Sequence, residues 1–390
     1  MTRMLASVTG PDEAEIALGG GADIIDLKDP ARGALGAVAP GVIRATVAAI
    51  GGRGTSSAVA GDLPMQPGLV AATVHEIAAC GVDYVKLGLF PGGDAAACIR
   101  DLAALATRVR LIAVFFADAS PDLSLLPLLA QSGFAGAMID THGKRAGRLL
   151  DHFTVSGLHA FVEDCHAARL IAGLAGSLEA PDIPRLLVLA PDLLGFRGAL
   201  CGTGGRAEVL DPGRVQTVRG LIPPEGAARE MHAVDYRLLA ARGYAPAAGE
   251  DVPVDRVFVD DLVLPVFIGA YAHERAAPQR VRFAVDAWVM RTGRAAEDMR
   301  DVFSYDLIVD AIRLLVDSGH IALVETLAER IAAMVLAHPR VTRVAVRVQK
   351  LETGTGNVGV EIERTRPAAR AVAWPPPSLP ITPRLAGTKS

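Results

Sequence analysis

The sequence predicts an α/β fold, a (β/α)8 TIM barrel followed by a smaller α+β domain. About eight short apolar runs alternate with helical segments over the first 220 residues, as in parallel α/β proteins. A phrase in which Gly or Pro precedes Asp and an apolar run recurs at Asp23, Asp83 and Asp192, and such a repeat suits a closed barrel. From about residue 255 the pattern changes to long alternating strands around two amphipathic helices.

The barrel domain is predicted to span residues 1–220. Its strands are the apolar runs at residues 4–8, 22–30, 55–60, 82–89, 110–118, 136–141, 172–178 and 193–198. Its helices are expected at residues 11–18, 66–79, 94–108, 123–132, 158–168 and 183–189. No G-x-G-x-x-G sequence follows the first strand, so a dinucleotide-binding sheet has little support.

Residues 221–254 are predicted to be a linker, with one helix near residues 229–242, because Pro and Gly interrupt Ala-rich sequence there. The second domain is predicted at residues 255–366 in the order ββααββ. Its strands are expected at residues 256–264, 280–290, 342–350 and 358–364, and its helices at residues 304–318 and 321–337. Residues 367–390 are Pro-rich and are predicted to form a disordered tail.

The composition argues against several classes of protein. The net charge of −4 and the pI of about 6.2 do not favour a nucleic-acid partner, although small anionic substrates remain possible. The four cysteines show neither a C-x-x-C pair nor zinc spacing, so we expect reduced thiols in a cytoplasmic protein without a metal or cofactor. No signal-peptide core and no apolar run of membrane-spanning length occur, so no membrane partner is expected.

Charged residues end several of the predicted barrel strands. Asp26 and Lys28 lie on one face of their strand because side chains alternate along it. Late positions on other strands hold Lys86, Asp118, Asp140 with Lys144 after it, and Arg197. A charged side chain on a buried strand is costly unless its face opens into a site. We therefore expect these groups to meet at the carboxyl-terminal mouth of the barrel, where Asp26, Asp118 and Arg197 would bind substrate.

Lysines at such a mouth predict Schiff-base and phosphate chemistry. Burial populates the neutral amine, which can attack a carbonyl carbon and form an imine. Lys28, Lys86 and Lys144 could divide imine formation and phosphate binding between them, while Asp140 moves protons. Glycine-rich loops after the last two strands indicate a phosphate site. Its expected donors lie at Gly176, Ser177, Gly202 and Gly204.

Together, these motifs resemble the (5-formylfuran-3-yl)methyl phosphate synthase family over about residues 4–220. The matching pieces are Gly-Gly-Ala-Asp-Ile-Ile-Asp-Leu-Lys28-Asp-Pro, Gly-x-Leu-Gly36, Asp-Tyr-Val-Lys86-Leu-Gly-Leu, Asp140-Thr-x-x-Lys144, Ala-Gly-Ser-Leu178 and Arg197-Gly-Ala-x-Cys-Gly202. The resemblance implies condensation of two glyceraldehyde 3-phosphate molecules to the furan precursor of methanofuran-type cofactors. It also implies that Lys28 forms the Schiff base and that Lys86, Asp140 and Lys144 are catalytic.

The second domain resembles dihydroneopterin aldolase over about residues 255–365. The matching pieces are Ile-Gly-Ala-Tyr-x-x-Glu274 with Gln279, Ser-Tyr305, Leu-Val-Glu325-x-Leu-Ala-Glu-Arg-Ile-Ala, Lys350, and Asn-Val-Gly-Val-x-Ile-Glu-Arg364. The resemblance implies a T-fold-like domain in which Glu274 and Glu325 bind a pterin. It also implies that Lys350 and Tyr305 handle protons in a retro-aldol cleavage without metal or Schiff base. Active sites of this fold lie at subunit interfaces, so we expect a homo-oligomer formed through this domain.

Three hypotheses for function follow from the two halves. The leading one is a bifunctional biosynthetic enzyme that acts on a small phosphorylated aldehyde and on a pterin. In the second, only the barrel is catalytic and the second domain is an oligomerisation module. In the third, the barrel is a different Schiff-base aldolase that acts on phosphorylated sugars.

Overall fold

The computed structural model describes residues 2–91, 93–143, 147–202, 205–222, 253–291, 302–352 and 356–366. The chain divides into two compact units, residues 1–228 and 229–390, and each is described by itself. Most of the predicted linker with its helix, and the predicted tail, lie outside the described residues. No helix within the described ranges is long and apolar enough to cross a bilayer.

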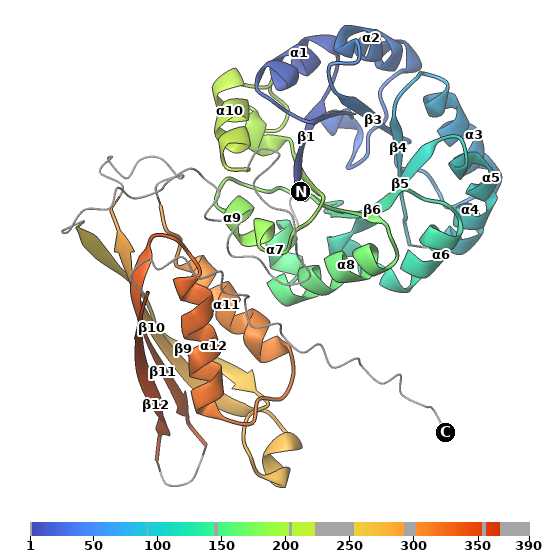
Figure 1. Ribbon diagram of the computed structural model, residues 1–390. Coiled ribbons are helices and arrows are strands. Elements are labelled where there is room, and N and C mark those ends of the chain that lie inside the picture. Colours follow the sequence, from blue (N-terminus) through green and yellow to red (C-terminus); the bar gives the residue numbers. More distant parts are fainter. Residues whose placement is uncertain are drawn as a thin grey trace, which may run out of the picture. The chain divides into compact units, whose positions relative to one another are not determined.

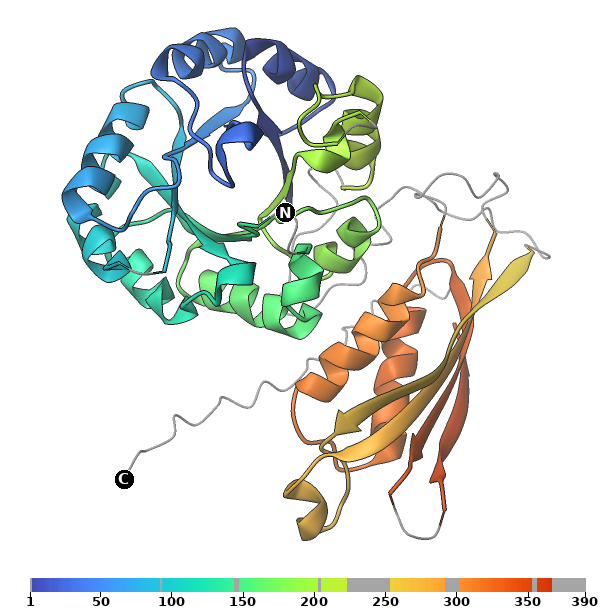
Figure 2. The same cartoon turned by 180° about the vertical axis from the view of Figure 1, so that it is seen from behind.

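The first unit is a closed barrel of eight parallel strands, paired in chain order, with β8 returning to β1 (Figure 1). The strands are β1 (Arg3–Val8), β2 (Ile24–Leu27), β3 (Thr55–Val59), β4 (Tyr84–Gly88), β5 (Arg110–Phe116), β6 (Gly136–Asp140), β7 (Ile171–Leu174) and β8 (Leu193–Phe196). Helices surround the strands on the outside, as both views show (Figure 2). The predicted TIM-type barrel is therefore confirmed.

The surrounding helices vary in length. They are α1 (Pro11–Gly19), α2 (Pro40–Ile50), α3 (Pro67–Ala78), α4 (Ala95–Asp101), α5 (Ala103–Ala106), α6 (Leu126–Gln131), α7 (Leu149–His152), α8 (Val155–Ala167), α9 (Asp182–Leu187) and α10 (Pro212–Gly220). Short 3-10 turns are η1 (Pro30–Arg32), η2 (Ala117–Ala119), η3 (Leu123–Leu125) and η4 (Gly198–Leu200).

Two of the longer helices, α2 and α10, were not predicted, and neither was the single turn α7. Helix α2 begins at Pro40, is followed by the left-handed capping residue Gly51, and buries Ile43 and Ile50. Helix α10 begins after Asp211, whose carboxylate accepts a hydrogen bond from the backbone N–H of Arg214. Proline at the first position and a capping aspartate are ordinary helix-start signals, so the sequence carried enough information to find both.

The barrel interior changes from apolar to polar along the strands. An apolar cluster includes Leu5 on β1, Ile24 on β2, Tyr84 on β4 and Met138 on β6. Two residues further along each strand, on the same face, lie Ser7, Asp26, Lys86 and Asp140. The period of two therefore places an apolar base below a ring of polar and charged groups.

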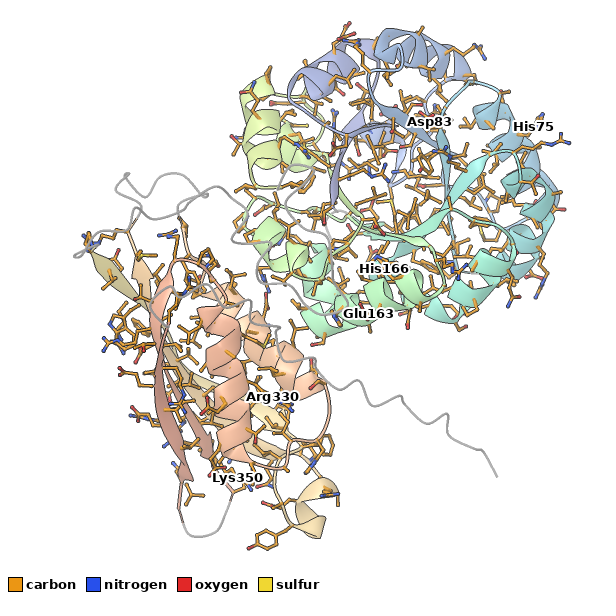
Figure 3. All side chains as sticks on the ribbon, in the orientation of Figure 1. His75, Asp83, Glu163, His166, Arg330 and Lys350 are labelled. Atoms are coloured by element: carbon orange, nitrogen blue, oxygen red, sulfur yellow. The ribbon has the colours of Figure 1, made fainter. Side chains whose placement is uncertain are left out.

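A recurring carboxylate ties pairs of strands together at their amino-terminal ends. Asp23, Asp83 and Asp192 each directly precede an even-numbered strand. Each accepts a 2.8 Å hydrogen bond from a backbone N–H of the preceding strand, at Met4, Ser56 and Ala172 respectively. Figure 3 labels Asp83. The weak sequence repeat thus marks a repeated two-strand contact at the end of the barrel that usually serves stability.

The second unit is a four-stranded antiparallel sheet in the order β12-β11-β10-β9, with two helices on one face (Figures 1 and 2). Its elements are β9 (Val254–Val266), η6 (Ala272–Arg275), β10 (Gln279–Met290), α11 (Asp306–Asp317), α12 (Val324–Leu336), β11 (Val341–Lys350) and β12 (Val358–Thr365). Alternate residues of β10, such as Val281, Phe283 and Val285, are buried, as expected for a sheet with one covered face. The predicted ββααββ domain is confirmed.

Candidate active sites

The carboxyl-terminal mouth of the barrel opens into a cavity of about 770 Å³. This volume lies within the range usual for small-molecule sites. Of the residues predicted for the site, the cavity is lined by Lys28, Lys86, Asp140, Gly176, Ser177 and Arg197. Residues that are far apart in the sequence therefore meet in one space. Lys144 and Gly204 lie outside the described residues.

Lys86 is held by the fully buried carboxylate of Asp26. The Lys86 Nζ atom donates to Asp26 Oδ2 at 2.5 Å, and the Ser57 hydroxyl donates to Asp26 Oδ1 at 2.5 Å. Strand register makes this possible, since Ser7, Asp26 and Ser57 are neighbours on β1, β2 and β3. Burial lowers the pKa of Lys86; the Asp26 charge opposes this shift and the Lys28 charge adds to it.

Lys28 and Asp140 form a second, looser pair. Lys28 Nζ lies 3.5 Å from Asp140 Oδ2, a full ångström further than the separation in the first pair. The Lys28 backbone N–H donates to the carbonyl of Val8, which fixes the start of its side chain beside β1. Asp140 Oδ1 accepts from the backbone N–H of Thr141 at 2.7 Å. Lys28 is therefore buried yet less tightly bound than Lys86.

Asp118 contacts the loop that follows β6. Its two carboxylate oxygens accept from the backbone N–H groups of His142 at 2.7 Å and Gly143 at 2.6 Å. Burial would raise the pKa of Asp118, but these hydrogen bonds outweigh it and the pKa is lowered. The carboxylate thus fixes the backbone that leads from Asp140 towards Lys144.

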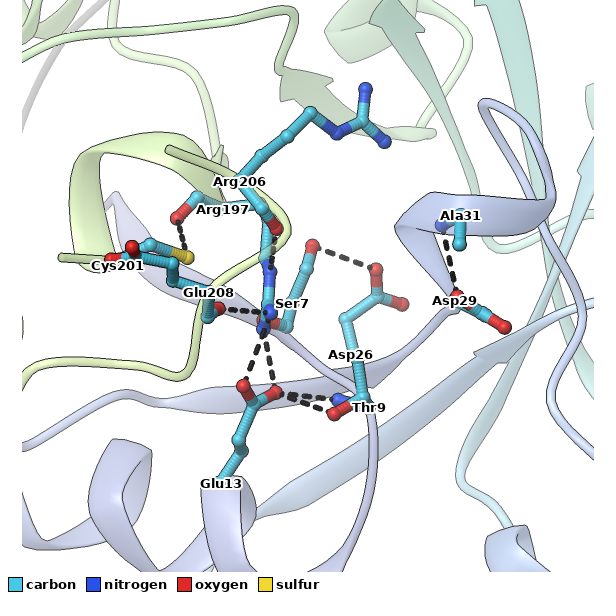
Figure 4. Close-up of polar contacts among 10 residues, drawn as sticks. All are labelled: Ser7, Thr9, Glu13, Asp26, Asp29, Ala31, Arg197, Cys201, Arg206 and Glu208. Atoms are coloured by element: carbon cyan, nitrogen blue, oxygen red, sulfur yellow. Dashed lines mark hydrogen bonds and ion pairs between the residues drawn. The ribbon is translucent and has the colours of Figure 1, made fainter. Parts of the chain in front are cut away.

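Arg197 has a bonding pattern that its sequence position did not reveal. Its five N–H groups donate to the Glu13 carboxylate, twice, and to the carbonyls of Ser7, Arg206 and Glu208 (Figure 4). All of its donors are therefore taken by protein acceptors. Arg197 joins β1, α1 and the loop after β8.

Glu13 is the partner that the sequence analysis missed. Its carboxylate also accepts from the backbone N–H of Thr9 at 2.7 Å and from the Thr9 hydroxyl at 2.9 Å. Burial would raise the pKa of Glu13, but Arg197 and Thr9 outweigh it and the pKa is lowered. In the sequence, Glu13 has only the features of an acidic residue in the first turn of a helix.

The second unit brings three of its predicted residues to one end of the sheet. Glu274 accepts hydrogen bonds from Lys350, from Gln279 Nε2 at 3.2 Å and from the Tyr271 backbone N–H at 3.0 Å. Figure 3 shows Lys350 at this end of the sheet. Lys350, with smaller contributions from Tyr271 and Gln279, lowers the pKa of Glu274 to about 2.

Gly269 allows this cluster to form. Its φ is +139°, and an added Cβ atom would lie within 2.5 Å of all three carboxylate atoms of Glu274. Such close approach of a carboxylate to the backbone is possible only without a side chain at this position.

Glu325 lies at the same end of the sheet, whereas Tyr305 does not. Ile321 exchanges backbone hydrogen bonds with Phe267 and Gly269, which places the start of α12 and the exposed Glu325 near Glu274. Tyr305 directly precedes α11, whose twelve residues span about 18 Å before the chain reaches that end. The Tyr305 side chain is 60% exposed. Within a single chain, Tyr305 therefore lies away from the other residues predicted to act on the pterin, Glu274, Glu325 and Lys350.

Comparison with known families decides the identity of the barrel. The sequence model of 4-HFC-P synthase matches residues 4–219. This chain belongs to the 4-HFC-P synthase family. It is 48% identical to a Methylorubrum extorquens protein over 213 residues, 55% of this chain and 88% of that protein. It is 38% identical to (5-formylfuran-3-yl)methyl phosphate synthase of Methanopyrus kandleri over 216 residues, 52% of this chain and 91% of that protein.

The second unit is a dihydroneopterin aldolase-like (FolB) domain, because that family's model matches residues 257–363. Two solved structures are similar to it. The chain is 33% identical to dihydroneopterin aldolase from Burkholderia thailendensis bound to guanine, covering 29% of this chain and 93% of that one with a TM-score of 0.27. It is 31% identical to the E. coli enzyme in complex with neopterin, covering 28% and 98% with a TM-score of 0.26.

The predicted glycine-rich loops of the synthase barrel lie at the cavity rim. Gly176 has a φ of +119°, and the exposed Ser177 that follows has a φ of 51°, unusual for a residue with a side chain. An added Cβ atom on Gly202 would lie 2.3 Å from a carboxylate oxygen of Glu208, so a side chain there would displace this carboxylate. The first loop therefore depends on backbone conformations that most residues avoid, whereas Gly202 leaves room for the Glu208 carboxylate.

Arg206 is a cavity residue of the synthase barrel that lies just after a predicted glycine-rich loop but was not predicted as a site residue. It lines the cavity together with Lys28, Lys86 and Asp140. Its Nε atom is buried and has no hydrogen-bond partner among the described residues. In Figure 4 its guanidinium extends away from the Arg197–Glu13 cluster. A partial signal was available, since Arg206 directly follows two glycines of a predicted phosphate loop.

Proposed function

We propose that the barrel condenses two glyceraldehyde 3-phosphate molecules to (5-formylfuran-3-yl)methyl phosphate through an imine on Lys28. The observation that carries this proposal is the pair of lysines, each with its own carboxylate, in one cavity. A binding protein would not need two buried amines, whereas a reaction with both a nucleophile and a proton carrier does.

The looser pair supplies the nucleophile. Asp140, 3.5 Å from Lys28, takes a proton from the ammonium, and the free amine attacks the carbonyl carbon of the triose. Loss of one water molecule leaves a protonated imine, which acidifies the adjacent C–H bond. Deprotonation there produces the carbon nucleophile that joins the second triose. Over the whole reaction, two triose phosphates lose one phosphate and two water molecules to form the furan.

The tighter pair handles protons beside the imine. The lowered pKa of Lys86 brings its ammonium closer to the range in which a group can both give and take a proton. Asp26 keeps Lys86 in place through the 2.5 Å contact, so the amine of Lys86 is less available to attack a carbonyl itself.

Product analysis tests this proposal. The purified protein given glyceraldehyde 3-phosphate should form a furan aldehyde phosphate, detected by ultraviolet absorption and mass spectrometry. Borohydride should trap the triose on Lys28, and Lys28→Arg, which keeps the charge but cannot form the imine, should give neither product nor adduct. A folded wild-type protein that traps the triose elsewhere, or releases a different aldol product, would favour another Schiff-base aldolase.

For the FolB domain we propose retro-aldol cleavage of dihydroneopterin to a hydroxymethyl-dihydropterin and glycolaldehyde. The support is the Glu274–Lys350–Gln279 cluster, which combines a fixed carboxylate with a proton-carrying amine. Turnover of dihydroneopterin that is lost in Lys350→Ala but kept in Arg347→Ala would support it, because Arg347 pairs with Glu361 on β12. Absence of turnover in the intact wild-type chain would favour the alternative in which the FolB domain only mediates oligomerisation.

We further propose that this second activity requires a homo-oligomer. Tyr305 directly precedes α11, whereas Lys350 pairs with Glu274 near the point that the chain reaches after this helix. A neighbouring copy is therefore needed to bring the two groups together. Co-expression of Tyr305→Phe and Lys350→Ala chains should then restore part of the turnover that each variant lacks. Mixed oligomers without any recovered turnover would contradict a shared site.

A further inference from the structure

We propose that Arg206 binds the phosphate group of the triose phosphate in the barrel cavity and that the buried Arg197–Glu13 pair positions it. The identity of the phosphate ester rests on the proposed condensation, whereas the anion site itself does not. Arg206 was not among the predicted site residues, so this assignment adds a specificity residue to the site.

The first argument is the unfilled hydrogen bond of Arg206. A buried guanidinium N–H without an acceptor is costly, and native proteins rarely leave one without reason. Arg206 Nε is such an atom, and its side chain lines the same cavity as Lys28 and Lys86. A bound anion would supply the acceptor that the described part of the chain does not.

The second argument compares the two arginines of one loop. Arg197 gives all five of its N–H groups to protein acceptors and has none left for a ligand. Among the described residues, the Arg206 guanidinium finds no hydrogen-bond acceptor, although the Asp140 charge acts on it, and it extends away from the Arg197 cluster, as Figure 4 shows. Arg197, which was predicted to bind substrate from its strand position, is therefore the anchor, and we assign Arg206 as the ligand.

The third argument is how the anchor directs Arg206. Arg197 Nε donates to the Arg206 carbonyl at 3.0 Å, and Arg197 Nη2 donates to the Glu208 carbonyl at 2.7 Å. These bonds fix the backbone on both sides of residue 207, so the start of the Arg206 side chain is defined. Glu13 holds the guanidinium of Arg197 through two oxygens and thereby fixes its plane.

The chemistry of the pocket selects a phosphate monoester. A guanidinium presents two parallel N–H groups that match two oxygens of a phosphate, and it remains charged at any working pH. The loops of residues 175–181 and 198–199 line the same cavity, at the place where barrels of this type commonly bind phosphate. A phosphate at Arg206 would leave the carbonyl end of the triose free to reach Lys28.

Binding of unreactive probes tests the assignment. By calorimetry, wild-type protein should bind glycerol 3-phosphate, which has no carbonyl, more tightly than inorganic phosphate. Arg206→Gln should weaken glycerol 3-phosphate binding by about 10- to 100-fold, since a charge-assisted hydrogen bond is lost. Arg206→Lys should lose less affinity, because it keeps the positive charge although it lacks the two parallel N–H groups of the guanidinium. Arg100→Gln, an exposed change on α4, is the matched control and should bind like wild type.

Imine trapping with unphosphorylated glyceraldehyde separates phosphate recognition from chemistry. Arg206→Gln should trap glyceraldehyde on Lys28 as wild type does, but trap glyceraldehyde 3-phosphate less efficiently. Three outcomes would overturn the assignment. Imine trapping in Arg206→Gln could fall equally with both aldehydes, glycerol 3-phosphate binding in this variant could stay unchanged, or the wild type could bind inorganic phosphate but not glycerol 3-phosphate. If no furan forms but glycerol 3-phosphate still binds through Arg206, the proposed condensation fails and this inference stands.

The positioning role has its own test. Glu13→Gln and the milder Arg197→Lys should weaken glycerol 3-phosphate binding by about 3- to 10-fold while leaving glyceraldehyde trapping unchanged. A merely structural role would lower the melting temperature of both variants without changing the ratio of imine trapping between glyceraldehyde 3-phosphate and glyceraldehyde. If both folded variants bind glycerol 3-phosphate like wild type, the positioning role is excluded.

Discussion

The barrel and the FolB domain gather their candidate residues in different ways. In the barrel, parallel strands all end at one mouth, so groups from β2, β4 and β6 meet within a single chain. In the FolB domain, an open antiparallel sheet has two distant ends, and Tyr305 lies away from Glu274 and Lys350. The closed fold brings its described candidate residues together within one chain, whereas in the open fold one predicted residue, Tyr305, lies away from the others of the same chain.

The sharpest test of this difference is to remove the barrel nucleophile. Lys28→Arg should lower furan formation by at least about 1,000-fold because guanidinium does not form the imine. Dihydroneopterin turnover, measured on the same preparation, should stay within error of wild type. A parallel loss of both activities would show that the two units do not work independently.

The corresponding change in the FolB domain is Lys350→Met. Removing the ammonium should raise the pKa of Glu274 from about 2 towards its ordinary value of 4.5, measured by carbon-13 NMR titration of labelled glutamate. Because the folded pKa is lowered, the pair stabilises the fold above about pH 4.5, and this stabilisation is lost as pH falls towards 2. The stability difference between wild type and variant should therefore shrink on acidification. A Glu274 pKa that does not move would contradict the described contact.

Asp118→Ala should affect the barrel reaction less than removal of the nucleophile. It frees two backbone N–H groups at His142 and Gly143, so the loop leading to Lys144 loses its anchor. We expect furan formation to fall by about 10- to 100-fold at saturating substrate. Asp122→Ala, in the same loop, should change the rate little, because among the described residues its carboxylate accepts hydrogen bonds only from Ser124.

The smallest effect is expected at the opposite end of the barrel. Asp83→Ala removes the acceptor for the Ser56 backbone N–H and hydroxyl and should lower the free energy of unfolding by about 1 kcal/mol. Furan formation should be unchanged because this end carries no site residue. Urea unfolding and steady-state rates on the same samples provide the check, and a reduced rate with unchanged stability would contradict the division between the two ends.

Much of the synthase site followed from strand periodicity. Alternation places Asp26 and Lys28 on one face, and the closed barrel then brings Lys86 and Asp140 to them. What periodicity cannot supply is the partner of each polar group. Arg197 and Arg206 look alike in sequence, and only the position of Glu13, 184 residues from Arg197, separates the anchor from the ligand.

The same limit applies to Asp118 and Tyr305. Asp118 ends a predicted strand as the other predicted ligands do, but in the structure it lies in η2 and its oxygens accept hydrogen bonds from the backbone of a loop 24 residues later. Tyr305 matches the aldolase pattern in sequence, yet helix length keeps it from Lys350 within one chain. Sequence patterns state which groups are available, whereas hydrogen-bond partners depend on the folded backbone.

The three carboxylates at the amino-terminal end of the barrel have an uneven distribution. Ala135 stands directly before β6, where Asp23, Asp83 and Asp192 stand before β2, β4 and β8. Of the four pairs in which an even-numbered strand follows an odd-numbered one, β5–β6 is therefore the one without such a carboxylate. We expect local opening of the barrel to occur there first. Amide hydrogens at the beginning of β6 should then exchange faster than those of the three pairs that are joined by an aspartate. Asp140 terminates the same strand, so fluctuations there would reach the proposed proton acceptor of Lys28.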